Sequence, residues 1–449
     1  MKIKLTCLLF FVSFTFFAQE EQKEYSFSLE EAIEYAIDSS YNAINARRDI
    51  EAAIKRKWET TADGLPQIDA NIDYQNNLKR PVQLLPAEIT GGPPGTFIPV
   101  QFGTKQNLSA TATATQLLFD GSYLVALRAS KTFLDYTNTT TQKTLLEVRK
   151  SVIDAYGNVL LAQELVTILE SNQTTLQKNY DETKEIFENG LQEEEAVEQL
   201  QITLLQITNQ LNNAKRLVGI TQEMLNLTLG IPLVHEITLT EDLDNLAEEN
   251  ISLTLMNTEG SIEENLDYKL AQNLIEQREH EYNLERTKAL PRLTTFLNYG
   301  TTANSEKFTF LNDNQQWFQS SIWGVSLNIP IFSSLKRSAK TAQARIALDQ
   351  AETQFDQAKE QIRLQIDRAK NDYQFAIENY QTAKQNLKLA ERIENKNQIK
   401  FTEGLATSFE LRQAQTQLYQ TQQEFIESML EVINKKAALE TILNTVPLN

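Results

Sequence analysis

Residues 351–390 read AETQFDQAKEQIRLQIDRAKNDYQFAIENYQTAKQNLKLA and carry the strongest structural signal in the chain. Apolar and small side chains recur there at alternating steps of three and four residues. This spacing is typical of a long helix that packs in a coiled-coil manner. The whole stretch from Leu335 to Phe401 lacks proline and glycine. It predicts a helix of roughly 100 Å at 1.5 Å per residue. The apolar stripe consists of Ala351, Phe355, Ala358, Ile362, Ile366, Ala369, Tyr373, Ala376, Tyr380, Ala383, Leu387 and Ala390.

The composition limits the classes of partner and reaction. The 449 residues include 60 acidic and 42 basic side chains, which gives a net charge of −18. Because nucleic-acid binding needs a concentrated basic face, we expect no nucleic-acid partner. His235 and His280 stand alone, and the sequence contains no phosphate-binding glycine loop and no nucleophile motif. We therefore expect no enzyme, no cofactor and no metal site.

Residues 1–19 have the features of a secretory signal peptide. Lys2 and Lys4 precede an apolar run from Leu5 to Phe17, and Ala18-Gln19 offers a cleavage site. The alternative is a membrane anchor, but a run of about thirteen residues is too short to span a bilayer. Cys7, the single cysteine, lies inside this run, so the exported chain would contain no thiol.

The first half of the chain reads as an ordered series of elements. Ser28-Leu29-Glu30-Glu31 has the form of a capping box at the start of a helix that should end before Gly64-Leu65-Pro66. Apolar and polar residues then alternate over residues 67–75, which predicts a strand with one apolar and one polar face. Five prolines and four glycines interrupt residues 79–105, so we expect an irregular loop there.

A second alternating segment covers residues 108–115 and predicts another strand. A helix of nearly 100 Å follows, from about Tyr123 to Asn189. A turn at Gly190-Leu191 and a return helix to Gly230 complete this half. The first half is therefore predicted to contain a helix, two strands, a very long helix and a return helix.

The same order recurs after an acidic connector at residues 231–260. A helix ends at Ala289-Leu290-Pro291, alternating segments cover residues 293–299 and 323–329 around a loop at 300–319, and the long helix follows. It turns at Gly404-Leu405 and is followed by a return helix. We therefore predict a first structural repeat over residues 20–230 and a second over 261–449.

Amphipathic strands occur in soluble sandwiches and in membrane barrels, and two features favour the barrel. The neighbouring helices are too long to cover the strands as a second layer, and the signal peptide directs the chain out of the cytoplasm. No strand edge can remain unpaired in a bilayer, and four strands cannot close a barrel. Two copies would supply eight strands and three would supply twelve. Since an eight-stranded barrel is filled by its own side chains, a conducting barrel favours three copies.

The chain resembles the TolC-type outer-membrane efflux and secretion channels. The similarity rests on the Ser28 capping box, both Leu-Pro junctions before strands, Leu118-Phe119-Asp120-Gly121, Pro330-Ile331-Phe332 and both Gly-Leu turns. It implies a mainly α fold with membrane strands: a homotrimer with a twelve-stranded barrel in outer-membrane lipid and a coiled-coil α-barrel in the periplasm. It also implies an exit duct of a tripartite efflux pump or type I secretion system, which meets a periplasmic adaptor and an inner-membrane pump.

The resemblance assigns roles to residues at the two turns. Gly190, Leu191, Gly404 and Leu405 would form the tip that docks the adaptor, although both glycines could simply be helix C-caps. Their exact role is left open by the sequence.

Acidic residues near the turns are candidates for the pore. The resemblance places Glu410 in a ring of carboxylates that would favour cations, although it could equally be a solvated surface residue. Other pore or gate candidates are Glu403 and the run Glu193, Glu194 and Glu195, which could instead favour the helix dipole. Phe401 and Ala406 stand where the type member of the family has gate residues, so any polar lock must differ here.

A different class of protein also uses long helices. A periplasmic coiled-coil adaptor or a trimeric surface fibre would need no channel. The four amphipathic strands and the double repeat argue against both.

Overall fold

The computed structural model describes residues 25–191, 193–256 and 261–445, so the predicted signal peptide at 1–19 lies outside the described residues. The chain divides into two compact units. The first contains Met1–Ile44, Leu145–Thr258 and Arg368–Val446, and the second contains Asn45–Thr144 and Glu259–Asp367 with the C-terminal residues. Each unit therefore takes segments from both predicted repeats, whose boundaries stay a prediction.

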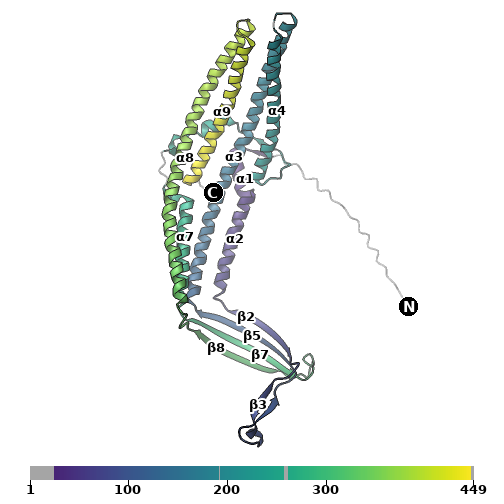
Figure 1. Cartoon of the computed structure of the whole chain (residues 1–449), viewed down its shortest axis with the longest axis vertical. Helices are drawn as coiled ribbons and strands as arrows, with labels where there is room; N and C mark the ends of the chain where they lie inside the picture. Colours follow the sequence, from purple (N-terminus) through teal and green to yellow (C-terminus); the bar gives the residue numbers. More distant parts are fainter. Residues whose placement is uncertain (1–24, 192, 257–260, 446–449) are drawn as a thin grey trace, which may run out of the picture. The chain divides into compact units, whose positions relative to one another are not determined.

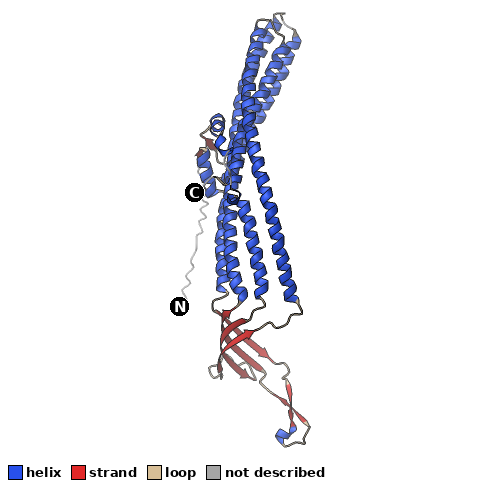
Figure 2. Ribbon diagram, turned by 90° about the vertical axis from the view of Figure 1, so that its left-hand side faces the viewer, coloured by secondary structure: helices blue, strands red, loops and turns tan. Residues whose placement is uncertain are grey.

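The second unit contains a four-stranded antiparallel sheet (Figures 1 and 2). Its strand order is β2 (Gln67–Asn76), β5 (Gln106–Phe119), β7 (Arg292–Ser305) and β8 (Phe318–Asn328). The register brings like side chains together: Ile68 pairs with Ala114, and Ala114 pairs with Leu297. On the opposite face Asn71 pairs with Thr111. One face of the sheet is thus mainly apolar and the other mainly polar, as the period of two predicts.

Two segments that were predicted as loops contain strands in the structure. Residues 79–105 contain a hairpin of β3 (Val82–Pro86) and β4 (Phe97–Gln101), joined through the 3-10 helix η1 (Ala87–Thr90), so the expectation of an irregular loop was wrong. Prolines are tolerated because an isolated hairpin consists only of edge strands, and Gly91 and Gly95 supply positive φ angles of 82° at its end. The predicted loop at 300–319 is also too long, since β7 continues to Ser305 and β8 starts at Phe318.

Four helices belong wholly or partly to the second unit. They are α2 (Tyr41–Ala62), α3 (Gly121–Glu188), α7 (Leu266–Thr287) and α8 (Lys336–Thr402). The predicted first helix is divided in two: α1 (Leu29–Ser39) ends at Ser40, whose ψ of 146° leaves the helical region and whose hydroxyl then accepts from the Ala43 backbone at 3.3 Å. The capping box of Ser28 and Glu31 is confirmed.

Helices dominate the first unit (Figure 1). Besides its parts of α3 and α8 it contains α4 (Glu194–Leu229) and α9 (Ser408–Leu443). A core of Leu169, Leu176, Leu200, Ile207, Leu211 and Ala214 joins α3 to α4. The predicted stripe of α8 is buried or half-buried along its length, with Tyr373 and Ala376 fully buried. The pattern of threes and fours therefore marks the packed face of α8.

The predicted connector holds short elements of the first unit. They are β6 (Ile237–Leu239), which pairs in parallel with β1 (Tyr25–Phe27), and the helices α5 (Leu243–Glu249) and α6 (Leu253–Met256), followed in the second unit by η2 (Ile262–Glu264). Tyr156 on α3 donates to the Phe27 carbonyl at 3.1 Å. Burial, with the nearby charge of Glu241, raises the pKa of Tyr156 to about 12, so this tyrosine stays a hydrogen-bond donor.

By length and composition, α3 is apolar enough to cross a membrane, which the sequence analysis did not predict. A core helix passes the same test. Val152, Tyr156 and Val159 are fully buried against other parts of the first unit. Packing within the protein therefore accounts for part of the apolar character of α3, since 44% of its apolar window is buried.

Candidate functional site

Both turns between long helices have the same backbone geometry. Gly190 and Gly404 adopt φ angles of 76° and 75°, the left-handed region that favours glycine. The amide of Leu191 donates to the Ile186 carbonyl at 3.1 Å, and that of Leu405 donates to the Lys400 carbonyl at 2.7 Å. These bonds form the Schellman motif that ends a helix. The glycines are therefore C-caps, as one of the two interpretations holds.

The leucines that follow the glycines point to a further role. Leu191 is 78% exposed and Leu405 is 73% exposed, so the turns present an apolar side chain to the solvent at equivalent positions. An apolar residue at this position of a Schellman motif frequently packs back on its own helix, whereas both leucines here stay mostly exposed. Phe409, one turn into α9, is also exposed. Exposed apolar groups at both turns are the kind of feature that marks a protein contact.

Glu410 has a local structural role that the sequence analysis did not predict. Its carboxylate accepts from the Thr407 amide at 2.8 Å, and the Glu410 amide donates to the Thr407 hydroxyl at 3.2 Å. Together they form a capping box at the start of α9. The backbone and side-chain hydrogen bonds from Thr407 lower the pKa of Glu410, so the exposed carboxylate stays charged.

The other acidic candidates are also exposed. Glu193 is the N-cap of α4 without a side-chain hydrogen bond, and Glu194 and Glu195 stand in the first turn. Their place agrees with a favourable interaction with the helix dipole. Glu403 is exposed beside Gly404, whereas Phe401 is half-buried and its carbonyl accepts from the Gly404 amide at 3.0 Å. The pore role of all these residues stays a prediction.

A polar link joins α3 to α8 before the turns. Asn179 is only 3% exposed, and its amide exchanges two hydrogen bonds with Gln398, at 3.0 and 2.9 Å. A second amide pair joins Asn172 on α3 to Gln422 on α9 at 2.8 Å. The sequence analysis missed both pairs. The available signal was a buried amide within an otherwise apolar helix stripe, which gives no hint of its partner.

A half-buried carboxyl group lies near this link. Burial raises the pKa of Glu394 on α8, and the Gln415 side chain on α9 opposes the shift. Gln415 itself is only 1% exposed. The pKa of Tyr419 is raised by burial and by the charge of Glu394. The helices before the turns thus pack around polar groups.

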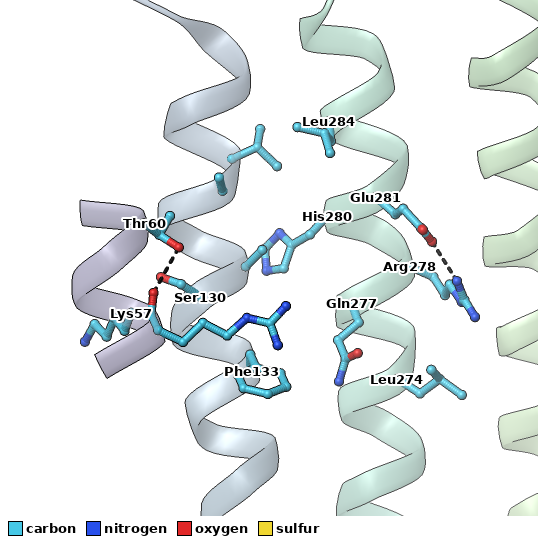
Figure 3. A pocket seen from close by; sticks show the side chains of 14 residues that line it. Lys57, Thr60, Ser130, Phe133, Leu274, Gln277, Arg278, His280, Glu281 and Leu284 are labelled. Atoms are coloured by element: carbon cyan, nitrogen blue, oxygen red, sulfur yellow. Dashed lines mark hydrogen bonds and ion pairs between the residues drawn. The ribbon is translucent and has the colours of Figure 1, made fainter. Parts of the chain in front are cut away.

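A cavity of about 410 Å³ lies between α2, α3 and α7 in the second unit (Figure 3). The guanidinium of Arg56 lies 4.8 Å from the centre of the Phe133 ring. His280 contacts the Thr132 hydroxyl at 3.0 Å, and Glu281 pairs with Arg278 at 2.7 Å. Arg56, His280 and Glu281 are therefore each engaged with a neighbour. Within the described ranges, no three acidic, histidine or cysteine side chains form a metal site.

Comparisons with known proteins assign the fold. The chain is similar to CusC, a protein that forms a transmembrane channel, with 16% identity, a TM-score of 0.72, and coverage of 92% of this chain and 91% of that chain. It is similar to the outer membrane protein VceC of Vibrio cholerae, with 15% identity, a TM-score of 0.71, and coverage of 92% and 95%. It is also similar to the Campylobacter jejuni outer membrane channel CmeC, with 16% identity, a TM-score of 0.71, and coverage of 92% of this chain and 85% of that chain.

No curated protein sequence matches the chain significantly. A family model described as outer membrane efflux protein matches residues 41–231 and 259–445, which confirms the resemblance seen in the duplicated motifs. The family comprises channels and not enzymes. This chain belongs to the outer membrane efflux protein family, and it resides in the outer membrane with its helical part in the periplasm.

Proposed function

We propose that three copies of this chain form the exit duct of a tripartite efflux pump or type I secretion system. Their strands would close one twelve-stranded barrel in the outer membrane. The duct would receive substrates from a periplasmic adaptor and an inner-membrane pump and conduct them passively to the exterior.

The open edges of the sheet carry this proposal. In the part of the chain that the structure describes, both outer strands, β2 and β8, lack a partner on one side, and nearly every residue in them is exposed. In a bilayer such edges must be paired. Strand β2 has ten residues, which matches the length of a membrane-spanning strand. Pairing β2 of one copy with β8 of the next satisfies both edges without any change within the chain.

The polar face of the sheet supports a water-filled interior. Asp69, Asn71 and Asp73 alternate with the apolar residues of β2, and the Asn71 amide donates to the Asp73 carboxylate at 2.7 Å. Serine and threonine follow on β5 at the paired positions. Polar side chains on the inner face and apolar side chains on the lipid face are typical of membrane barrels.

The two turns are the proposed adaptor contact. Leu191 and Leu405 are exposed at equivalent positions, and their capping hydrogen bonds do not need the side chains. Phe401 and Ala406 stand where the type member of the family has gate residues. The amide pair of Asn179 and Gln398 would take over that role here and hold the inner end closed at rest. The charged Glu410 and its neighbours would give this end a cation preference.

A leucine exchange at the turns tests the adaptor contact. We expect Leu191→Ser with Leu405→Ser to abolish co-purification of the co-expressed periplasmic adaptor while the trimer persists. Leu389→Ser is the matched control, because this leucine is also exposed but lies on α8 away from the turn. Equal adaptor recovery from the turn variant and the wild type would contradict the docking role. The sheet gives no support to the alternative of a soluble adaptor or fibre, since neither needs a membrane-spanning strand.

A further inference from the structure

The hairpin of β3 and β4 has an apolar face that none of the described residues covers. Register places Leu84 opposite Pro99 and Pro86 opposite Phe97 on one face, with Val82 beside them. Leu84 is 65% exposed and Phe97 is 61% exposed. Leu85, Ile98 and Val100 lie on the other face and are half-buried. A two-stranded hairpin with so much exposed apolar surface is only marginally stable in water.

The composition of the hairpin points to a packed environment. Between Pro81 and Thr104 the only charged residue is Glu88, and its carboxylate is already engaged by the Gly95 amide at 2.9 Å. Proline lacks an amide hydrogen, so Pro81, Pro86 and Pro99 weaken the hairpin edges as templates for another strand. The surface therefore suits side-chain packing and not strand addition.

The strand order decides which surface lies next to the hairpin. The hairpin follows β2 directly, and its base continues the β2–β5 pairing through the Asn77 amide, which donates to the Lys105 carbonyl at 2.8 Å. Strand β2 is an edge strand. In the proposed barrel its free edge pairs with β8 of the neighbouring copy, at the usual separation of about 4.8 Å. The loop of residues 306–317 that precedes that β8 would then stand beside the hairpin.

This loop also has uncovered apolar side chains. Leu311 is 85% exposed, and Trp317, directly before β8, is partly exposed. The chain's own hairpin touches the start of the loop through an ion pair between Arg80 and Glu306 at 3.1 Å, yet it leaves Leu311 open. Phe308 and Phe310 lie against Tyr74 with ring centres 5.8 and 6.1 Å away, which holds the loop over the end of the sheet.

We propose that the hairpin of each copy packs its apolar face against the loop of residues 306–317 of the neighbouring copy. Three such contacts would form a clasp around the outer rim, on the side of the membrane opposite the helices. The partner is thus a second copy of this chain. The inference rests on the proposed trimer and adds a contact that barrel closure by itself does not require.

Cross-linking between differently tagged copies tests the clasp. One copy carries Leu84→Cys and the other carries Leu311→Cys, and a flexible bismaleimide is added to intact cells. We expect a cross-linked product that contains both tags. A second pair, Asn76→Cys with Gln319→Cys, lies in β2 and β8 themselves, at the base of the hairpin and outside the loop of residues 306–317, so it reports barrel closure alone.

The two pairs separate the failure of the clasp from the failure of the trimer. A product from the basal pair without one from Leu84 and Leu311 would overturn the clasp and leave the barrel standing; a hairpin that lies on lipid gives this result. Absence of both products would overturn the clasp together with the proposed trimer. Each copy carries a single introduced cysteine, so a product that contains both tags can only join two copies.

Thermal dissociation of the trimer gives an independent readout. We expect Leu84→Ser with Phe97→Ser to lower the temperature at which the trimer separates on a gel, since both side chains are exposed in the single chain and only the clasp would bury them. Gln83→Ser, on the opposite face of β3, should leave this temperature unchanged. The proposal is contradicted if the trimer of the Leu84→Ser and Phe97→Ser variant dissociates at the same temperature as the trimer of the control variant.

Discussion

The amide pair between α3 and α8 yields the sharpest prediction about the gate. Asn179 and Gln398 exchange two hydrogen bonds of 3.0 and 2.9 Å, and Asn179 is almost fully buried. In Asn179→Leu the Gln398 amide loses both its donor and its acceptor partner. We expect this variant to favour the open form of the inner end, in which the two helices separate and water can reach the amide.

The size of the effect follows from the two bonds. A neutral hydrogen bond contributes about 1 kcal/mol net, and two such bonds give about 2 kcal/mol. This energy corresponds to an increase of about 30-fold in the ratio of open to closed channels. The double variant Asn179→Leu with Gln398→Leu replaces both amides by apolar groups, so it should recover most of the closed form.

Single-channel current in planar bilayers measures the open fraction directly. Gln177→Ala is the control, because Gln177 lies on the same turn of α3 but on another face, where its side chain is exposed and its amide bonds to Asp181 at 2.9 Å. Its open fraction should equal that of the wild type. The proposed lock is refuted if Asn179→Leu leaves the open fraction unchanged, or if the double variant is as open as the single one.

Three further variants test other residues of the inner end. Glu410→Gln keeps a capping side chain but removes its charge, so we expect a lower cation preference in bilayer currents. Because the pKa of Glu410 is lowered in the wild type, the wild-type preference should persist from pH 7 to pH 5. Unchanged selectivity would exclude Glu410 from the pore. Gly404→Ala should destabilise the α8–α9 turn by about 1 kcal/mol, because the positive φ of residue 404 is unfavourable for alanine. No atom lies within 4 Å of the added carbon, so a steric clash adds nothing to this cost. A thermal melt equal to that of the wild type would contradict this. The raised pKa of Glu394 means that the folded form binds more protons than the unfolded form just above pH 4.5. The stability of the fold should therefore fall as pH rises through that window. Glu394→Gln should remove this pH dependence from thermal unfolding. A pH dependence that survives the exchange would assign it to another group.

Periodicity predicted the main elements because each pattern reports a single packed face. The stripe of α8 and the alternation in β2 both correspond to faces that the structure packs or pairs. The hairpin at 79–105 was missed because its many prolines and glycines are typical of a loop. Its strands tolerate the prolines because β3 and β4 form a separate two-stranded sheet, in which each strand is an edge strand. The break at Ser40 was missed because a serine within a helical pattern is ambiguous between an interior residue and a cap.

The candidate site was less predictable than the fold. The turns at Gly190 and Gly404 follow from local backbone chemistry, so the sequence located them well. The Asn179–Gln398 pair links residues 219 positions apart, and no local pattern reports such a contact. The capping role of Glu410 was readable from Thr407 three residues earlier, but the resemblance to known channels drew attention to its charge instead.

The number of chains in the outer-membrane particle tests the central proposal most directly. A four-stranded sheet with two open edges must find partners to close a barrel in lipid. Native mass spectrometry of the detergent-extracted protein should give the mass of three mature chains, with no smaller closed species. A monomer, or a dimer with eight strands, would contradict the account of this protein as a trimeric duct.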